Sequence, residues 1–121
     1  MKNLMLSLVA TLLLSAPCLT AADASVIHVI TVKWKAETKP DQIEKVLSVV
    51  KSLPSQYPQF ITRVWTNPIK KQVPEGYNHV IVMEFKSEDA LKKYVDSPAQ
   101  KKFYEVYMPL REESRTSDIS N

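Results

Sequence analysis

Apolar residues recur along this chain at spacings that predict alternating strands and helices. Residues 26–34 are rich in β-branched side chains and largely apolar on both faces, which predicts a central strand. Apolar residues then follow every three or four positions, which predicts a helix with one apolar stripe. This stripe contains Ile43, Val46, Leu47, Val50 and Leu53. Thr38 and Pro40 suit the start of this helix, and Pro54 is expected to end it.

The second half of the chain continues this alternation. Strands are predicted at residues 60–66 and 77–85, separated by a polar loop and a turn that contains the chain's one glycine, Gly76. A second helix is predicted to begin after Ser87, break near residues 97–98 and resume toward Leu110. The tail, residues 111–121, is polar. We expect it to form at most a short edge strand near residues 116–119, or to be a mobile end.

This order of elements predicts an α+β fold, a ferredoxin-like sandwich of the order β-α-β-β-α with a short last strand as an option. Alternation along the strands places apolar residues on both faces of the sheet. One face would carry Ile27, Val29, Val80 and Val82, and the other Ile30, Val32, Ile81 and Met83. Two helices can cover only one face. We therefore expect a homodimer that pairs sheet to sheet as a dimeric α/β barrel.

The N-terminus has the pattern of an export signal. Lys2 precedes an apolar run over residues 4–17, and Ala22 and Ala24 form a small-x-small cleavage site. The run is shorter than the roughly 20 residues that a helix needs to cross a bilayer. We expect a signal peptide over residues 1–24, cleavage after Ala24, and a secreted or periplasmic protein with no membrane contact after cleavage.

The one cysteine offers an alternative, because bacterial lipoproteins are cleaved just before a lipidated cysteine. Cys18 is preceded by Pro17, where that pattern requires a small, flexible residue, so simple secretion is favoured over lipidation. The mature domain, residues 25–121, then has no cysteine. Without disulfides it must be held together by its core or by a partner subunit.

Charge and composition exclude several classes of function. The net charge is +3, and the basic residues are scattered among acidic ones, which predicts solvated faces and no nucleic-acid surface. A single glycine makes a phosphate-cradling loop untenable, and no cofactor is expected. His28, His79 and Glu84 are the only metal-site candidates, but alternation places Glu84 on the opposite face from His79. No metal site is therefore expected.

Three stretches in order, residues 28–35, 75–85 and 94–100, together resemble the stress-responsive α/β barrel (Dabb) family. The resemblance covers nearly the whole predicted mature domain. It implies a ferredoxin-like fold that pairs through its sheets, with a cavity between each sheet and its helices. Most members of the family have no assigned activity.

One plant branch of this family closes a polyketide chain by an aldol condensation, using histidines and a tyrosine in the cavity. The resemblance places the first of these histidines on His28 and the tyrosine on Tyr94. The second histidine ends a His-Pro-Ala-His stretch in that branch, and the corresponding residue here is Gln100. Glutamine cannot take up a proton near neutral pH, which argues against carrying the cyclase activity over.

The candidate catalytic residues are therefore His28 and Tyr94, and the candidate ligand-binding residues are these two with Gln100 and His79. Each has a structural alternative: His28 as a hydrogen-bonded core histidine, His79 as a structural residue at the mouth of the sheet, and Tyr94 as a packing residue. A hydrogen bond between His28 and Tyr94 would favour a functional role. Two functions follow: a homodimer that binds a small, partly apolar ligand or acts without catalysis, and a cyclase-like or lyase-like enzyme.

Overall fold

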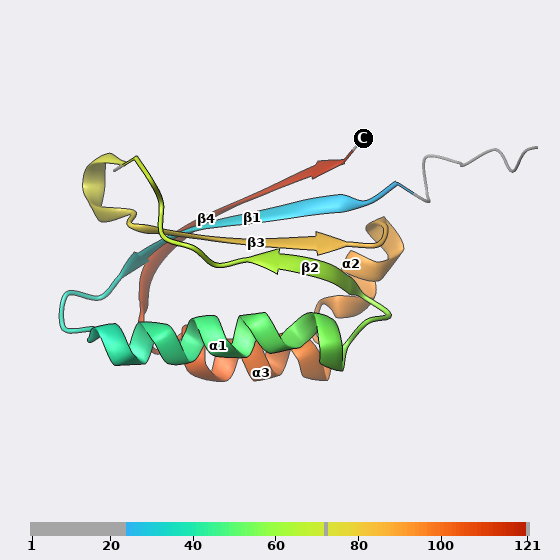
Figure 1. Cartoon of the computed structure of the whole chain (residues 1–121), viewed down its shortest axis with the longest axis horizontal. Coiled ribbons are helices and arrows are strands. Elements are labelled where there is room, and N and C mark those ends of the chain that lie inside the picture. Colours follow the sequence, from blue (N-terminus) through green and yellow to red (C-terminus); the bar gives the residue numbers. More distant parts are fainter. Residues whose placement is uncertain (1–23, 72, 121) are drawn as a thin grey trace, which may run out of the picture.

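The computed structural model describes residues 24–71 and 73–120. Residues 1–23 of the expected signal peptide, including Cys18, lie outside this part. The described chain forms one four-stranded antiparallel sheet with strand order β2-β3-β1-β4, and its helices lie on one face (Figure 1). The elements are β1 (Val26–Trp34), α1 (Pro40–Gln56), β2 (Ile61–Trp65), a 3₁₀ turn at Pro74–Gly76, β3 (His79–Phe85), α2 (Glu88–Tyr94), α3 (Pro98–Tyr107) and β4 (Arg111–Ser120).

The first helix differs from the sequence prediction at both ends. Its N-cap is Lys39, not Thr38, and the side chain of Gln42 accepts a hydrogen bond from the Lys39 backbone N–H at 2.9 Å. Pro54 lies inside the last turn and does not end the helix, which continues to Gln56. The backbone N–H of Tyr57 closes that turn on the carbonyl of Leu53 at 2.8 Å.

The core lies between the sheet and the helices. The inward residues of the two central strands are buried against the apolar stripe of α1 and the aromatic face of α3. This core includes Val26, Ile30, Val32, Val46, Leu47, Val50, Leu53, Ile61, Ile81, Met83, Phe85, Tyr94, Ala99, Phe103 and Tyr107. The stripe of α1 that the sequence predicted is therefore its buried face.

The last strand is much longer than the short edge strand expected near residues 116–119. β4 pairs with β1 along its whole length, from Val26 opposite Ser120 to Trp34 opposite Arg111. Figure 1 shows the two strands, red and blue, side by side at the edge of the sheet. The segment looked like a loose tail because β4 carries few apolar residues on either face. Pairing of its backbone with β1, rather than burial of its side chains, holds it in the sheet.

The outer face of the sheet has an apolar centre and no helix over it within the described residues (Figure 1). The paired residues Val29 and Val82 lie near its centre. Trp65 and Ile119 are 42% and 61% exposed there, which is unusual for such large apolar side chains. Across the described chain, the helices are all too short or too polar to serve as membrane spans.

Candidate functional site

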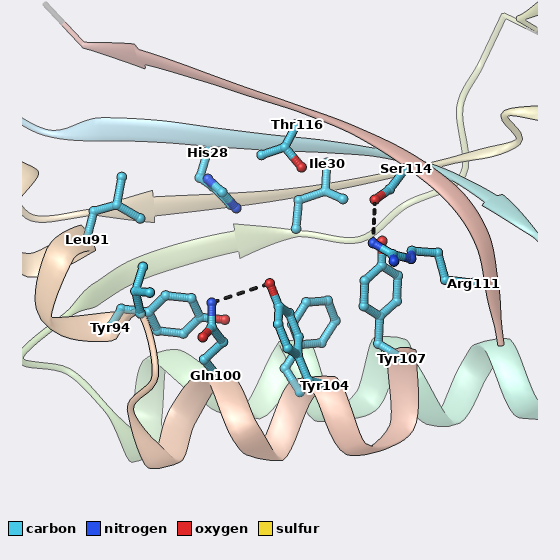
Figure 2. A pocket seen from close by; sticks show the side chains of 12 residues that line it. His28, Ile30, Leu91, Tyr94, Gln100, Tyr104, Tyr107, Arg111, Ser114 and Thr116 are labelled. Carbon is cyan, nitrogen blue, oxygen red and sulfur yellow. Dashed lines mark hydrogen bonds between the residues drawn. The ribbon is translucent and has the colours of Figure 1, made fainter. Parts of the chain in front are cut away.

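A cavity of about 320 Å³ lies between the inner face of β1 and β4 and the helices α2 and α3. Its lining includes the apolar residues Ile30 and Phe103, and Figure 2 shows Ile30 near the middle with polar groups at both ends. His28, Tyr94 and Gln100 lie toward one end, and Arg111 and Ser114 toward the other. The structure thus brings together three of the four site residues that the sequence suggested.

The side of the cavity formed by α3 follows from local sequence. Ser97 caps the helix, and its hydroxyl accepts a hydrogen bond from the backbone N–H of Gln100 at 3.3 Å. Gln100, Tyr104 and Tyr107 then recur at helical spacing, so their side chains share one face of α3. That face is turned toward the sheet and forms the floor of the cavity in Figure 2.

His28 is held by a carboxylate from the neighbouring strand. Its Nδ1 atom lies 2.5 Å from Oδ1 of Asp118, which faces it directly in the β1–β4 register. Because a carboxylate accepts hydrogen bonds, this contact places the imidazole proton on Nδ1 and leaves Nε2 as the free nitrogen. The ring is 17% exposed, and Figure 2 shows it directed from the sheet toward α3. His28 can therefore accept a proton or a hydrogen bond from a molecule in the cavity.

Tyr94 does not make the hydrogen bond with His28 that would link the two candidates. Its hydroxyl is buried and has no hydrogen-bond partner among the described residues, and the residue is 2% exposed. The ring packs on Phe85 with centroids 4.9 Å apart. Burial raises the pKa of Tyr94 well above its usual value, and Tyr104 adds to this, so the phenol is a neutral donor.

Gln100 is a fixed polar group and makes two hydrogen bonds. Its Oε1 accepts from the backbone N–H of Asp96 at 2.7 Å, and its Nε2 donates to the Tyr104 hydroxyl at 3.3 Å (Figure 2). Asp96 has a positive φ of 63°, so this contact braces the turn between α2 and α3. Gln100 can orient a ligand but cannot act as a base.

The other end of the cavity contains groups that the sequence analysis did not select. Nη1 of Arg111 donates to Oγ of Ser114 at 3.1 Å, while Nε of Arg111 is buried without a partner in the described chain. The hydroxyl of Tyr107 is also buried there, next to these two side chains. Burial raises the pKa of Tyr107, and the neighbouring Ser114 and Arg111 oppose that rise.

His79 is not part of this cavity. It lies on the same face of the sheet but lines a different hollow, beside α1. Its Nδ1 accepts a hydrogen bond from Nε1 of Trp34 at 2.9 Å, and burial lowers its pKa. A neutral imidazole that accepts from an indole N–H fits the structural alternative for this residue.

The described residues contain no cluster of three or more histidine, cysteine or acidic side chains that could hold a metal ion. Glu84 lies on the outer face of the sheet, where it pairs with Arg63 at 2.5 Å. It therefore lies on the opposite face from His79, as alternation along the strand indicated.

The cavity residues that sequence reasoning missed come from β4 and α3. Arg111 and Ser114 line the cavity, and Asp118 contacts His28 beside it, only because β4 pairs with β1 in one register, which no local pattern indicates. Tyr104 and Tyr107 carried a usable signal, since they follow Gln100 at helical spacing.

The fold and the cavity define a class of protein: a ferredoxin-like α+β domain with a ligand-sized cavity between its sheet and its helices. The Stress responsive A/B Barrel Domain (Dabb) family matches residues 26–121, nearly all of the described chain. The chain therefore belongs to this family, as its sequence indicated.

Known relatives fit this assignment. Olivetolic acid cyclase from Cannabis sativa is 29% identical over 84 residues, which are 69% of this chain and 83% of the cyclase. The hydroxynitrile lyase of Passiflora edulis has a similar structure, with a TM-score of 0.72, 16% identity, and coverage of 82% of this chain and 94% of the lyase. A dimeric ferredoxin-like protein from Thermobifida fusca gives a TM-score of 0.69 at 18% identity, with coverage of 81% and 92%. The two structural matches show a shared fold.

Proposed function

We propose that this protein is an exported homodimer that binds a small, partly apolar molecule in the cavity between its sheet and its helices. One observation carries the proposal: the hydroxyl of Tyr94 is buried at the cavity without a partner in the described chain. Buried polar groups in native proteins are nearly always hydrogen-bonded, and an unpaired one costs about 1–3 kcal/mol. A ligand with an acceptor group would satisfy this hydroxyl.

The size and lining of the cavity support this function. Its volume of about 320 Å³ falls within the range of small-molecule sites, which is roughly 300–1,000 Å³. Ile30 and Phe103 supply apolar contact in the middle, and a few polar groups stand at the ends. An apolar lining with few, well-placed polar groups is typical of ligand pockets.

The uncovered face of the sheet supports the homodimer. Exposed Trp65 and Ile119 lie on the same face as Val29 and Val82, and a second copy would bury them. Solved relatives from Thermobifida fusca, Bacteroides fragilis and Jannaschia are described as dimeric. Export is proposed on the N-terminal pattern alone, with cleavage after Ala24 and a secreted or periplasmic location.

Native mass spectrometry of the protein, expressed with its leader and purified from the medium or periplasm, tests these claims together. We expect a dimer whose N-terminus is Ser25 and which retains a small molecule released on unfolding. A monomer at micromolar concentration would contradict sheet-to-sheet pairing. An empty dimer that takes up nothing from an extract of the producing cells would contradict ligand binding.

A cyclase-like or lyase-like enzyme is the second candidate. The observation in its favour is that Asp118 fixes His28 with Nε2 free in the same cavity as the neutral phenol of Tyr94. A base and a hydrogen-bond donor facing one ligand could remove a proton next to a carbonyl and stabilise the resulting oxyanion. The relatives named olivetolic acid cyclase and hydroxynitrile lyase agree with this class of chemistry.

A further inference from the structure

The Arg111 side chain lies at the cavity end opposite His28, where α3 gives way to β4 (Figure 2). A guanidinium group has five N–H donors and is always charged. In the described chain Arg111 uses one hydrogen bond, from Nη1 to Ser114, and its buried Nε has no partner. None of the ion pairs formed by the described residues involves Arg111.

The acidic residues next to Arg111 are engaged elsewhere. Glu112 pairs with Lys33 at 3.5 Å. Glu113 lies close to Tyr77, whose pKa is raised first by burial and then by this carboxylate. The Tyr107 ring faces the guanidinium, with its centroid 5.9 Å from Cζ of Arg111. Arg111 is therefore a partly buried cation to which residues 24–71 and 73–120 supply an aromatic face and hydroxyls but no carboxylate at ion-pair distance.

A buried cation without a counter-ion is costly, and the cost falls when an anion binds beside it. Arginine suits this role because its planar fork donates two parallel hydrogen bonds to a carboxylate. The hydroxyl of Tyr107 lies at the same end, beside Ser114 and Arg111, and can donate a further hydrogen bond.

We propose that the cavity selects ligands that carry an anionic group, a carboxylate or a comparable oxyanion, and that Arg111 and Tyr107 bind it. The apolar body of the ligand lies over Ile30 and Phe103, and its far end meets His28 and Gln100. The substrate or ligand class is thus a small organic acid with an apolar middle. This inference rests on the proposed binding function and adds the charge of the ligand to it.

Two probes of matched shape test the proposal: 4-butylbenzoate, and 4-butylbenzamide as its neutral counterpart. Each is titrated into the isotope-labelled mature protein, and the NMR signals of His28, Tyr94 and Gln100 report occupancy of the cavity. We expect the carboxylate to bind at least about tenfold more tightly than the amide, as a charge-assisted pair predicts. Arg111→Gln should remove this preference, so that the two probes bind with equal affinity within about twofold.

Lys101→Gln is the control, because Lys101 is exposed on α3 outside the cavity and its loss changes the net charge equally. It should leave the tenfold preference intact. Equal affinities of the two probes for the unmodified protein would overturn the proposal whether or not the Arg111 variant folds, as would a preference that survives Arg111→Gln.

The failures of the two proposals can be told apart. If the amide shifts the cavity signals and the carboxylate binds no better, the anion inference fails and the binding function stands. If neither probe moves the signals of His28, Tyr94 and Gln100 at millimolar concentration, both fail.

Discussion

The side chains of His28 and Asp118 meet at 2.5 Å although 90 positions separate them in the chain. They are direct partners in the β1–β4 register, so the contact exists only when the polar C-terminal segment completes the sheet. This relationship turns a histidine on an apolar strand into an oriented group with one nitrogen free toward the cavity.

Removing the Asp118 carboxylate should release the His28 ring. In the Asp118→Ala variant the acceptor for the Nδ1 proton is gone, so the fraction of His28 in the Nδ1–H tautomer should fall. Long-range ¹H–¹⁵N NMR of the imidazole measures this directly. Ser117→Ala, on the same strand but the outer face, should leave the tautomer unchanged. An unchanged tautomer in Asp118→Ala would show that the carboxylate does not orient the ring.

Tyr94→Phe should stabilise the ligand-free protein while weakening ligand binding. The substitution removes a buried hydroxyl that has no partner in the described chain, which is worth about 1–3 kcal/mol in the free energy of unfolding. Tyr104→Phe is the matched control. It deletes the hydroxyl of the partly exposed Tyr104, which accepts a hydrogen bond from Gln100. We therefore expect the free energy of unfolding to fall by at most about 1 kcal/mol. Urea denaturation of both variants measures these changes. A destabilised Tyr94→Phe protein would contradict the conclusion that the Tyr94 hydroxyl is buried without a partner in the described chain.

The stability of the protein should fall as the pH is lowered through the range where histidine titrates. Burial lowers the pKa of His79 in the folded protein below its ordinary value of 6.5, so the unfolded chain binds a proton first. The neutral His79 side chain contributes its full stabilisation of the folded state above about pH 6.5. This contribution is lost progressively as the pH falls toward the lower, folded-state pKa of His79. Protonation also removes the acceptor for Trp34.

His79→Gln isolates this contribution, because glutamine can still accept from Trp34 but does not titrate in this range. Urea denaturation between about pH 5 and pH 7.5 measures the free energy of unfolding, which should depend less steeply on pH in the variant than in the unmodified protein. Identical slopes would mean that another group carries the pH dependence.

A charge at the centre of the outer sheet face should disrupt the homodimer. Val29 faces Val82 on β3 and Ser117 on β4, so Val29→Lys would place an ammonium group in the middle of the expected interface. We expect a folded monomer by circular dichroism and sedimentation velocity. Ser48→Lys, at an exposed position on α1, adds the same charge and should remain dimeric. A dimer that persists in Val29→Lys would place the interface elsewhere.

Gln100→His tests the enzyme candidate. It supplies a second proton-accepting group beside His28 and Tyr94, and aldol-type cyclisation of polyketide-like substrates should appear or increase if the cavity is cyclase-like. Gln56→His adds a histidine on the exposed surface of α1 and should have no effect. If the Gln100 variant and the unmodified protein are equally inert, the cyclase-like function is excluded.

Local patterns were enough to predict most of the fold. The β-branched run of β1, the three-and-four spacing in α1 and the break before Pro98 all correspond to observed elements. The uncovered apolar face also followed from alternation in β1 and β3. These features depend on residues close together in the chain, where backbone propensity and burial act in the same direction.

Three residues of the candidate site were equally accessible from the sequence. His28 stands out on an apolar strand, and Tyr94 and Gln100 flank the break between α2 and α3. The family resemblance brought them together, and the structure places all three at one cavity. A hydrogen bond from Tyr94 to His28 was one option for the functional role of this histidine, but Asp118 is its partner in the structure.

The sequence by itself thus determined the order of elements, the apolar core and the candidate histidine and tyrosine, because these are written in local spacing and side-chain type. Only the tertiary structure decided that the polar C-terminal segment is a strand, that Ser114 and Arg111 line the cavity, and that Asp118 contacts His28. The physical reason is that β4 is held by backbone pairing with β1 and its inward side chains meet a cavity. β4 therefore needs no apolar face, and its sequence lacks the hydrophobic periodicity from which a strand is predicted.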